Sequence, residues 1–220
     1  MAPPRALVIV GAGGQGREAL DTVEALNAAA PAPVWRFLGF LAHDDRTAEL
    51  LAARGVAVIG PVERLGDGSL EPDAEVVVAI GDPAVRRRVA DEVAAAGRRA
   101  ATLVHPSAQV GSQVVLGEGA YVGPAAVLTT NVRVGRHAIV NVAATLSHDV
   151  VVGDFATIGP GSHLAGNVHI GDDADLGIGV VARPGSSIGA GAVVGAGAVV
   201  IGDLPADVVA YGVPARPVPA

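Results

Sequence analysis

Cysteine is absent from the 220-residue chain, which excludes disulfides, thiolate metal sites and cysteine nucleophiles and fits a reducing cytoplasm. Aromatic residues make up only 3% although half of the residues are apolar, so the core must consist of Val, Ile, Leu and Ala in narrow, regular layers. Charged residues are few as well, at 17%. The formal net charge is −7 and no basic run occurs, so we expect no nucleic-acid partner.

Long apolar segments of the kind that insert into membranes are not expected either. The apolar run Leu7–Val10 is too short for the core of a signal peptide. The uncharged span Pro184–Gly202 is long enough to cross a bilayer, but it is rich in Gly and repeats with a period of six. We therefore predict a soluble, cytoplasmic protein without a membrane partner.

A period of six residues runs through the second half of the chain without an insertion or deletion. Seventeen consecutive positions spaced by six are apolar, and sixteen of them are Val, Ile or Leu. These positions are Val104, Val110, Leu116, Val122, Leu128, Val134, Val140, Leu146, Val152, Ile158, Leu164, Ile170, Leu176, Ala182, Ile188, Val194 and Val200. A second register, four residues later, holds only small or β-branched residues from Ala108 to Ala198.

This period matches neither an α-helix nor a single strand, but it matches a coil of three short strands joined by corners. Each coil takes three hexads, so residues 104–200 form between five and six coils of a parallel β-helix. The pattern resembles the hexapeptide-repeat acyltransferases. That resemblance implies a left-handed β-helix, acyl transfer, and acetyl-CoA as the acyl-donor substrate.

In the first half, strand signals alternate with helix signals, which predicts a small Rossmann-like parallel sheet of the α/β class. The expected strands are residues 6–10, 34–41, 56–59 and 75–80, and the expected helices are residues 17–29 and 84–95. We therefore divide the chain into an α/β domain, residues 1–102, and a β-helix domain, residues 103–220.

The segment Gly11-Ala-Gly-Gly-Gln-Gly16 lies directly after the first strand and opens the first helix, where glycine loops bind phosphate. An α/β domain of this size lacks the second half of a dinucleotide site, so we predict a mononucleotide or nucleotide sugar rather than NAD. The expected contacts to it are Gly11, Gly13, Gly14, Gln15, Gly16, Asp44, Gly81 and Asp82.

The order of a glycine-loop α/β domain and a hexapeptide β-helix is similar to one subgroup, the nucleotide-amino-sugar and sialic-acid acetyltransferases. The resemblance covers nearly the whole chain and implies a homotrimer. It rests on Gly11–Gly16, Val78-Ala-Ile-Gly-Asp82, His105-Pro-Ser-Ala108, Ser147-His-Asp149, Leu164-Ala-Gly-Asn167 and Tyr211-Gly-Val-Pro-Ala-Arg216.

By this resemblance His148 is the general base, and the acid that follows it is Asp149. Imidazole suits the removal of an amine proton near neutrality, and a carboxylate beside its other nitrogen would fix the tautomer. Adjacent residues of a strand point in opposite directions, so either Asp149 or a carboxylate from elsewhere could take that place. Gly166 is implied as the backbone donor to the oxyanion.

The resemblance further implies that acetyl-CoA lies in a groove between neighbouring prisms, over Gly166, Ile178 and the terminal coils. Arg183 and Arg216 either contact the phosphates of CoA or are solvated surface residues. Two positions depart from the subgroup. Gln15 stands where the subgroup often has a His near the nucleotide sugar, so the identity of the sugar stays open. Thr157 stands where a second His often follows the catalytic one, so the residues that contact CoA stay open.

The remaining histidines do not indicate a metal. No two of His137, His163 and His169 are separated by a whole coil, so they do not stack on one face of the prism. The spacings of His148, His163 and His169 also do not suggest the convergent ligands that a zinc site requires. We predict no metal site.

Four functions remain open from the sequence. The leading hypothesis is N-acetylation of a nucleotide-linked amino sugar, with a 4-amino-deoxy sugar as the expected acceptor. The nearest alternative is O-acetylation of a sugar of the sialic-acid type. A nucleotide-sugar-binding scaffold without turnover and an NAD-dependent oxidoreductase are the others.

Overall fold

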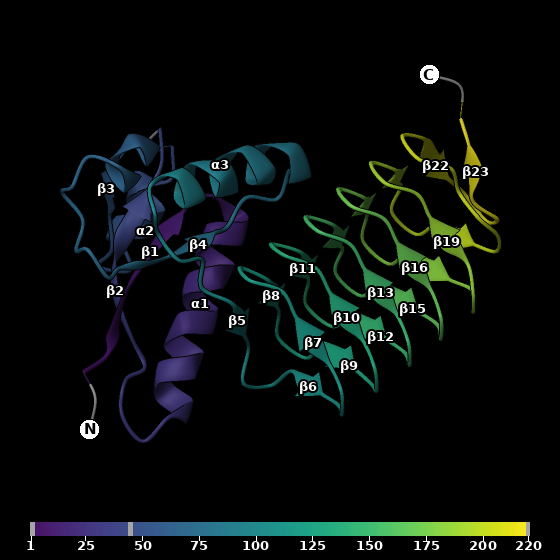
Figure 1. Ribbon diagram of the computed structural model, residues 1–220, viewed down its shortest axis with the longest axis horizontal. Helices are drawn as coiled ribbons and strands as arrows, with labels where there is room; N and C mark the ends of the chain where they lie inside the picture. The colour runs from purple at the N-terminus through teal and green to yellow at the C-terminus, as the bar shows by residue number, and fades with distance from the viewer. Residues whose placement is uncertain (1–2, 44–45, 219–220) are drawn as a thin grey trace. The chain divides into compact units, whose positions relative to one another are not determined.

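The computed structural model describes residues 3–43 and 46–218 (Figure 1). The chain forms two compact units, residues 1–106 and residues 107–220, each with its own core. Within the described residues, no helix combines the length and the apolar character that crossing a bilayer requires.

The first unit contains a four-stranded parallel sheet in the order β3-β2-β1-β4. The α/β class and the alternation of strands and helices agree with the prediction. Its elements are β1 (Arg5–Val10), α1 (Gly14–Ala29), β2 (Trp35–Leu41), α2 (Ala48–Ala52), β3 (Val58–Gly60), η1 (Val62–Leu65), β4 (Glu75–Val78), α3 (Pro83–Ala95) and β5 (Leu103–Val104).

Strand β1 is the centre of this core. After Arg5, every residue of the strand is buried, as expected for a parallel strand covered on both faces. Helix α1 contributes a stripe that includes Ala19, Leu20 and Val23 at helical spacing.

Two glycines allow the loop after β1 to pack against its neighbours. Gly11 has a φ of 101°, and a Cβ there would lie 2.5 Å from the carbonyl oxygen of Ala79, in the segment after β4. A Cβ on Gly16 would lie 1.9 Å from the carbonyl oxygen of Gly11, so α1 approaches the loop as closely as backbone allows. The glycine pattern thus fixes how the first strand, its loop and the first helix fit together.

The second unit is a parallel β-helix of two-residue strands that recur every six residues, in the register that the sequence predicts. The first face holds β6 (Gln109–Val110), β9 (Val127–Leu128), β12 (Thr145–Leu146), β15 (His163–Leu164), β18 (Val181–Ala182) and β21 (Val199–Val200). The second holds β7 (Val115–Leu116), β10 (Arg133–Val134), β13 (Val151–Val152), β16 (His169–Ile170) and β19 (Ser187–Ile188). The third holds β8 (Tyr121–Val122), β11 (Ile139–Val140), β14 (Thr157–Ile158), β17 (Asp175–Leu176), β20 (Val193–Val194), β22 (Val209–Tyr211) and β23 (Arg216–Pro217), which pairs with β22 antiparallel.

The predicted inward positions fill the prism, and most are buried; Leu146 and Ile158, for example, have no exposed surface. Val110, in the first coil, is the main exception at 44% exposure, because no further coil of the prism precedes it. The small register lies inside as well. At Ser162 this places a hydroxyl in the core, where it donates to the carbonyl of Gly177 (3.1 Å) and accepts from the amide of Val180 (3.2 Å).

Stability of the prism should depend on this inward column. Replacing Leu146 by Ala removes a fully buried side chain that the rigid stack cannot collapse around, so we expect a loss of about 2–5 kcal/mol. Replacing the outward-facing Val115 by Ala should change stability by less than about 0.5 kcal/mol. Urea unfolding of the two variants beside the wild type measures both values, and equal losses would contradict the inward assignment.

Candidate active site

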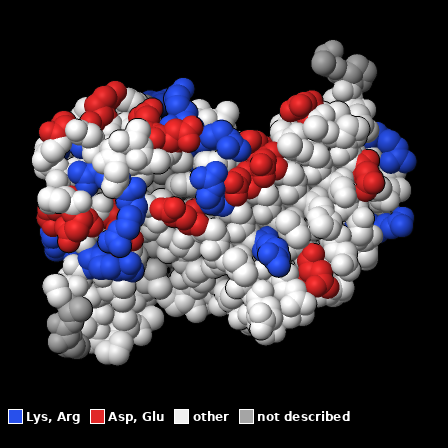
Figure 2. Space-filling model, viewed as in Figure 1, with Lys and Arg blue, Asp and Glu red and all other residues white. Residues whose placement is uncertain are grey.

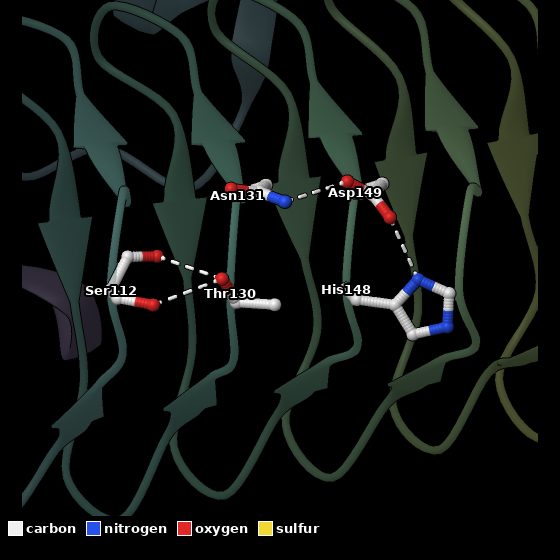
Figure 3. A network of polar contacts seen from close by, with 5 residues as sticks. All are labelled: Ser112, Thr130, Asn131, His148 and Asp149. Carbon is white, nitrogen blue, oxygen red and sulfur yellow. Dashed lines mark hydrogen bonds and ion pairs between the residues drawn. The ribbon is translucent and has the colours of Figure 1, made fainter.

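His148 and Asp149 lie at the corner between β12 and β13 rather than within a strand. Asp149 has a φ of 62°, and this left-handed conformation turns its side chain back toward its neighbour. His148 Nδ1 and Asp149 Oδ2 are 2.8 Å apart (Figure 3). The alternation of strand side chains, which left the partner of His148 open, does not apply at a corner.

The pair is half-exposed, with 57% of the His148 side chain and 45% of the Asp149 side chain accessible. Asp149 also accepts a hydrogen bond at Oδ1 from Asn131 Nδ2 (3.1 Å), one coil earlier. The bond with His148, and after it the bond from Asn131, lowers the pKa of the Asp149 carboxyl below its ordinary value. An ionised carboxylate can only accept, so Nδ1 of His148 is the donor in this contact, and in a neutral ring Nε2 then presents a lone pair.

Gly166 lies one coil after His148, at the same corner of the prism. A Cβ on Gly166 would lie 2.3 Å from both Nε2 and Cε1 of the imidazole, so the ring rests directly over the glycine backbone. The amide of Asn167 donates to the carbonyl of His148 (2.9 Å), which ties the two corners together. The structure therefore brings His148, Asp149 and Gly166 into one cluster.

A groove of about 530 Å³ opens beside Asp149 on the face formed by β10, β13 and β16. It is lined by Gln113, Val115, Asn131, Arg133, Asp149, Val151, Asn167 and His169. Sequence reasoning missed this groove and the contact of Asn131. The signal that could have found the contact is the spacing of one whole coil between Asn131 and Asp149.

The other residues expected near CoA lie apart from one another. Ile178, at the corner between β17 and β18, is 64% exposed. Arg183 donates to the carbonyl of Ile201 (3.2 Å) beside a hollow of about 320 Å³. That hollow is lined by Arg183, Pro184, Gly185, Ser186, Ile201, Gly202 and Asp203. Arg216 lies in β23, donates to the carbonyl of Ala215 (2.9 Å) and does not line the hollow.

In the first unit, a pocket of about 560 Å³ opens where β1, β2 and the segment after β4 end. In doubly wound sheets, ligands bind at this edge, where neighbouring connections leave the sheet in opposite directions. The pocket is lined by Val10, Gly11, Ala12, Gly13, Leu41, Ala42, His43, Arg46, Thr47, Val62, Ile80, Val85, Arg88, Val89 and Glu92.

Of the residues expected to contact a nucleotide sugar, Gly11 and Gly13 line this pocket. Gly14, Gln15, Gly16, Gly81 and Asp82 are not in its lining, and Asp44 lies outside the described residues. Asp82 instead caps α3, accepting at Oδ1 from the amide of Val85 (2.9 Å). Arg46, Arg88 and Glu92 were missed because nothing in the local sequence places them at the edge of the sheet.

Within residues 3–43 and 46–218, no group of three or more His, Asp or Glu side chains could hold a metal ion.

Comparisons with known proteins show which family has this architecture. Residues 6–93 match the PglD N-terminal domain family. No curated protein sequence matches the chain significantly. Among solved structures, the chain is similar to the acetyltransferase domain of PglB from Neisseria gonorrhoeae FA1090 in complex with acetyl coenzyme A. The two are 33% identical, with 98% of this chain and 100% of that chain covered and a TM-score of 0.88.

Two further structures support the match over nearly the full length. PerB from Caulobacter crescentus, in complex with CoA and GDP-perosamine, is 33% identical, with 97% of each chain covered and a TM-score of 0.85. WeeI from Acinetobacter baumannii AYE is 27% identical, with 97% of this chain and 100% of that chain covered and a TM-score of 0.81.

The α/β unit and the stacked hexapeptide coils are both covered by these matches. The chain belongs to the family of hexapeptide-repeat acetyltransferases that carry a PglD N-terminal domain. This confirms the resemblance found in the sequence, the fold class with its left-handed β-helix, and the assignment as an acyltransferase.

The close approach at Gly166 makes a specific prediction. A methyl group there must displace the imidazole of His148, so Gly166→Ala should lower kcat/KM for acetyl transfer by about 100-fold or more. The loss is measured as CoA thiol release. Gly66→Ala is the control, because a Cβ on Gly66 meets nothing within 4 Å. Gly66 also lies in the first unit, whereas His148 and Gly166 lie in the second. Wild-type activity in Gly166→Ala would show that the ring does not act from this position.

Proposed function

We propose that this protein is an N-acetyltransferase that moves the acetyl group of acetyl-CoA to the amino group of a nucleotide-linked amino sugar. A 4-amino-deoxy sugar is the acceptor that we expect. Relatives support the proposal, since one is described with acetyl coenzyme A and another with CoA and GDP-perosamine as a perosamine N-acetyltransferase. The observation that carries it is the pairing of His148 with Asp149 over the backbone of Gly166.

In the proposed reaction, the neutral amine attacks the thioester carbonyl carbon directly. A C–N bond forms as the amine proton passes to Nε2 of His148, and the carbonyl oxygen becomes an oxyanion. The C–S bond then breaks, and the sulfur leaves as a thiolate that takes the proton back from the imidazolium. Asp149 stabilises the positive charge on the ring and keeps Nδ1 protonated throughout.

The amide of Gly166 is the proposed donor to the oxyanion. Across the described part of the chain, no backbone carbonyl accepts a hydrogen bond from this N–H. Its position beside the imidazole puts a donor and a base on the same reacting carbon.

The first unit is proposed to hold the nucleotide. Gly11 and Gly13 offer backbone next to the start of α1, and Arg46 and Arg88 bring two cations to the same pocket. Guanidinium groups and helix N-termini both suit a diphosphate. The pocket volume of about 560 Å³ lies within the range of small-molecule sites.

The acyl donor is proposed to lie along the prism from Gly166 toward the later coils. Ile178 offers an exposed apolar surface to the pantetheine arm. Arg183 is the first candidate to bind a CoA phosphate, because it lines the hollow described above, and Arg216 is the second.

A homotrimer is the proposed assembly. Figure 2 shows few charged side chains over the coils of the prism in that view. Large aliphatic side chains are also exposed on it, among them Val142, Ile178, Val181 and Val193. Such a surface is suited to burial against copies of itself.

The assembly has a direct test. Size-exclusion chromatography with light scattering should give a molecular mass of three times 21.7 kDa. A mass of 21.7 kDa would contradict the trimer.

The reaction is tested by thiol release from acetyl-CoA with UDP-, dTDP- and GDP-linked 4-amino sugars. We expect turnover with one of them. Loss of the base in His148→Ala should reduce kcat by about 10²–10⁴-fold, the usual contribution of a positioned general base. The variant should unfold at the wild-type temperature, because His148 is half-exposed.

Each other outcome has a definite meaning. Turnover that survives in His148→Ala would refute its role as the base. If no amino sugar causes thiol release but a sugar with an acceptor hydroxyl does, the reaction is O-acetylation and not N-acetylation. Tight binding of acetyl-CoA and a nucleotide sugar without thiol release would indicate a scaffold without turnover.

A further inference from the structure

The carboxylate of Asp149 is held at both of its oxygens by side chains. Oδ2 faces Nδ1 of His148 at 2.8 Å, and Oδ1 accepts from the amide of Asn131 at 3.1 Å (Figure 3). Asn131 therefore contacts the partner of the proposed base without contacting the base itself.

Asn131 occupies the same corner position as Asp149, one coil earlier. Both residues adopt the left-handed conformation, with φ values of 60° and 62°. The amide of Asp149 donates to the carbonyl of Thr130 (3.1 Å), so the two corners are also joined through the backbone. This stacking fixes the backbone from which the side chain of Asn131 reaches Asp149.

The corner that carries Asn131 is itself anchored to the preceding coil. The amide of Asn131 donates to the carbonyl of Ser112 (3.0 Å). The hydroxyl of Thr130 lies 3.2 Å from the same carbonyl and 3.0 Å from the hydroxyl of Ser112 (Figure 3). A continuous set of contacts thus runs along the corners of three coils and ends at His148.

Another acid on the prism, Asp154, uses its carboxylate in a different way. Asp154 directs Oδ1 to the backbone amide of Arg136, one coil earlier (2.8 Å), and Oδ2 to the guanidinium of the same residue (3.0 Å). Both of its oxygens serve the joint between coils. In Asp149, the amide side chain of Asn131 meets one oxygen and leaves the other for the imidazole.

Orientation matters here because the pair is exposed. A carboxylate with 45% of its side chain accessible can rotate toward water unless a second partner fixes it. When the carboxylate leaves, Nδ1 loses its acceptor and the ring no longer keeps its proton on that nitrogen. The lone pair on Nε2 is then present only part of the time.

We infer that Asn131 is a positioning residue for acyl transfer, which orients the Asp149 carboxylate and thereby sets the tautomer of His148. This role rests on the proposed function, with His148 as the base. It adds to that function a residue one coil away that acts only through Asp149.

The kinetic test uses substitutions that the corner tolerates. Asn131→Gly removes the amide and accepts a φ of 60° without strain, and Asn131→Asp keeps the shape but sets a second carboxylate against Oδ1. We expect kcat to fall about fivefold to tenfold in Asn131→Gly, as for loss of one typical hydrogen bond, and further in Asn131→Asp. KM for both substrates should stay within about twofold. Asp173→Gly, at another left-handed corner (φ 57°) that lines neither the groove nor the hollow, is the control and should retain full activity.

A double substitution separates positioning from a general structural effect. In an Asp149→Gly background, Asn131→Gly should cause no further loss of kcat, because its only route to the base is gone. Losses that multiply in the double variant would overturn the inference. So would a full kcat in Asn131→Gly.

A spectroscopic readout makes the test independent of turnover. With ¹⁵N-labelled histidine, the wild type should show His148 protonated at Nδ1, and Asn131→Gly should shift its two nitrogen resonances toward a tautomer mixture. An unchanged His148 spectrum would overturn the inference even if acetyl transfer is observed. If no acceptor supports turnover but the spectrum shifts, the proposed function fails while the positioning role of Asn131 stands.

Discussion

Every interior coil of the prism pairs its backbone with the coils before and after it, and no residue is inserted or deleted along the column from residue 104 to residue 200. The amide of Thr145, for example, donates to the carbonyl of Ser162, and this pattern repeats at each face. Because the pairing is continuous, the side chain at a given corner lies directly over the one from the coil before it. The inward leucine column, the closeness of Gly166 to His148 and the contact between Asn131 and Asp149 all follow from this one register.

The first unit depends on a different constraint, the close approach of backbone to backbone. Gly11 and Gly16 let the loop after β1 lie against the segment after β4 and against the first helix. That packing brings the ends of β1, β2 and the segment after β4 to one edge, where the pocket of the first unit opens. The two units thus position their sites by unrelated means: stacking in one and glycine contacts in the other.

How much the sequence could predict differs between the units for physical reasons. A strict period of six is a long-range pattern written in every coil, so it predicted the strands of the prism and their inward residues almost without error. The exposed Val110 differs because a terminal coil lacks a neighbour, which no periodicity records. In the α/β unit, the four strands of the sheet and the helices α1 and α3 were predictable, but the short helices α2 and η1 and the lining of the pocket were not. Arg46, Arg88 and Glu92 meet there only through the fold, and Asp82 serves as a helix cap.

For the site on the prism, His148, Asp149 and Gly166 were named from resemblance. Their mutual geometry required knowledge of the corner, where the left-handed conformation of Asp149 lets adjacent side chains meet.

The stacking of corners also has an evolutionary consequence. In most enzymes, the neighbours of a functional carboxylate are scattered through the chain, and a change in one of them can be offset from several directions. Here the neighbours of position 149 along the prism are positions 131 and 167, fixed by the length of a coil. Substitutions in this family should therefore covary at separations of one whole coil. Substitutions near such a site should therefore occur at positions that are whole coils apart. Between these positions, insertions or deletions that are not a whole coil long should be absent.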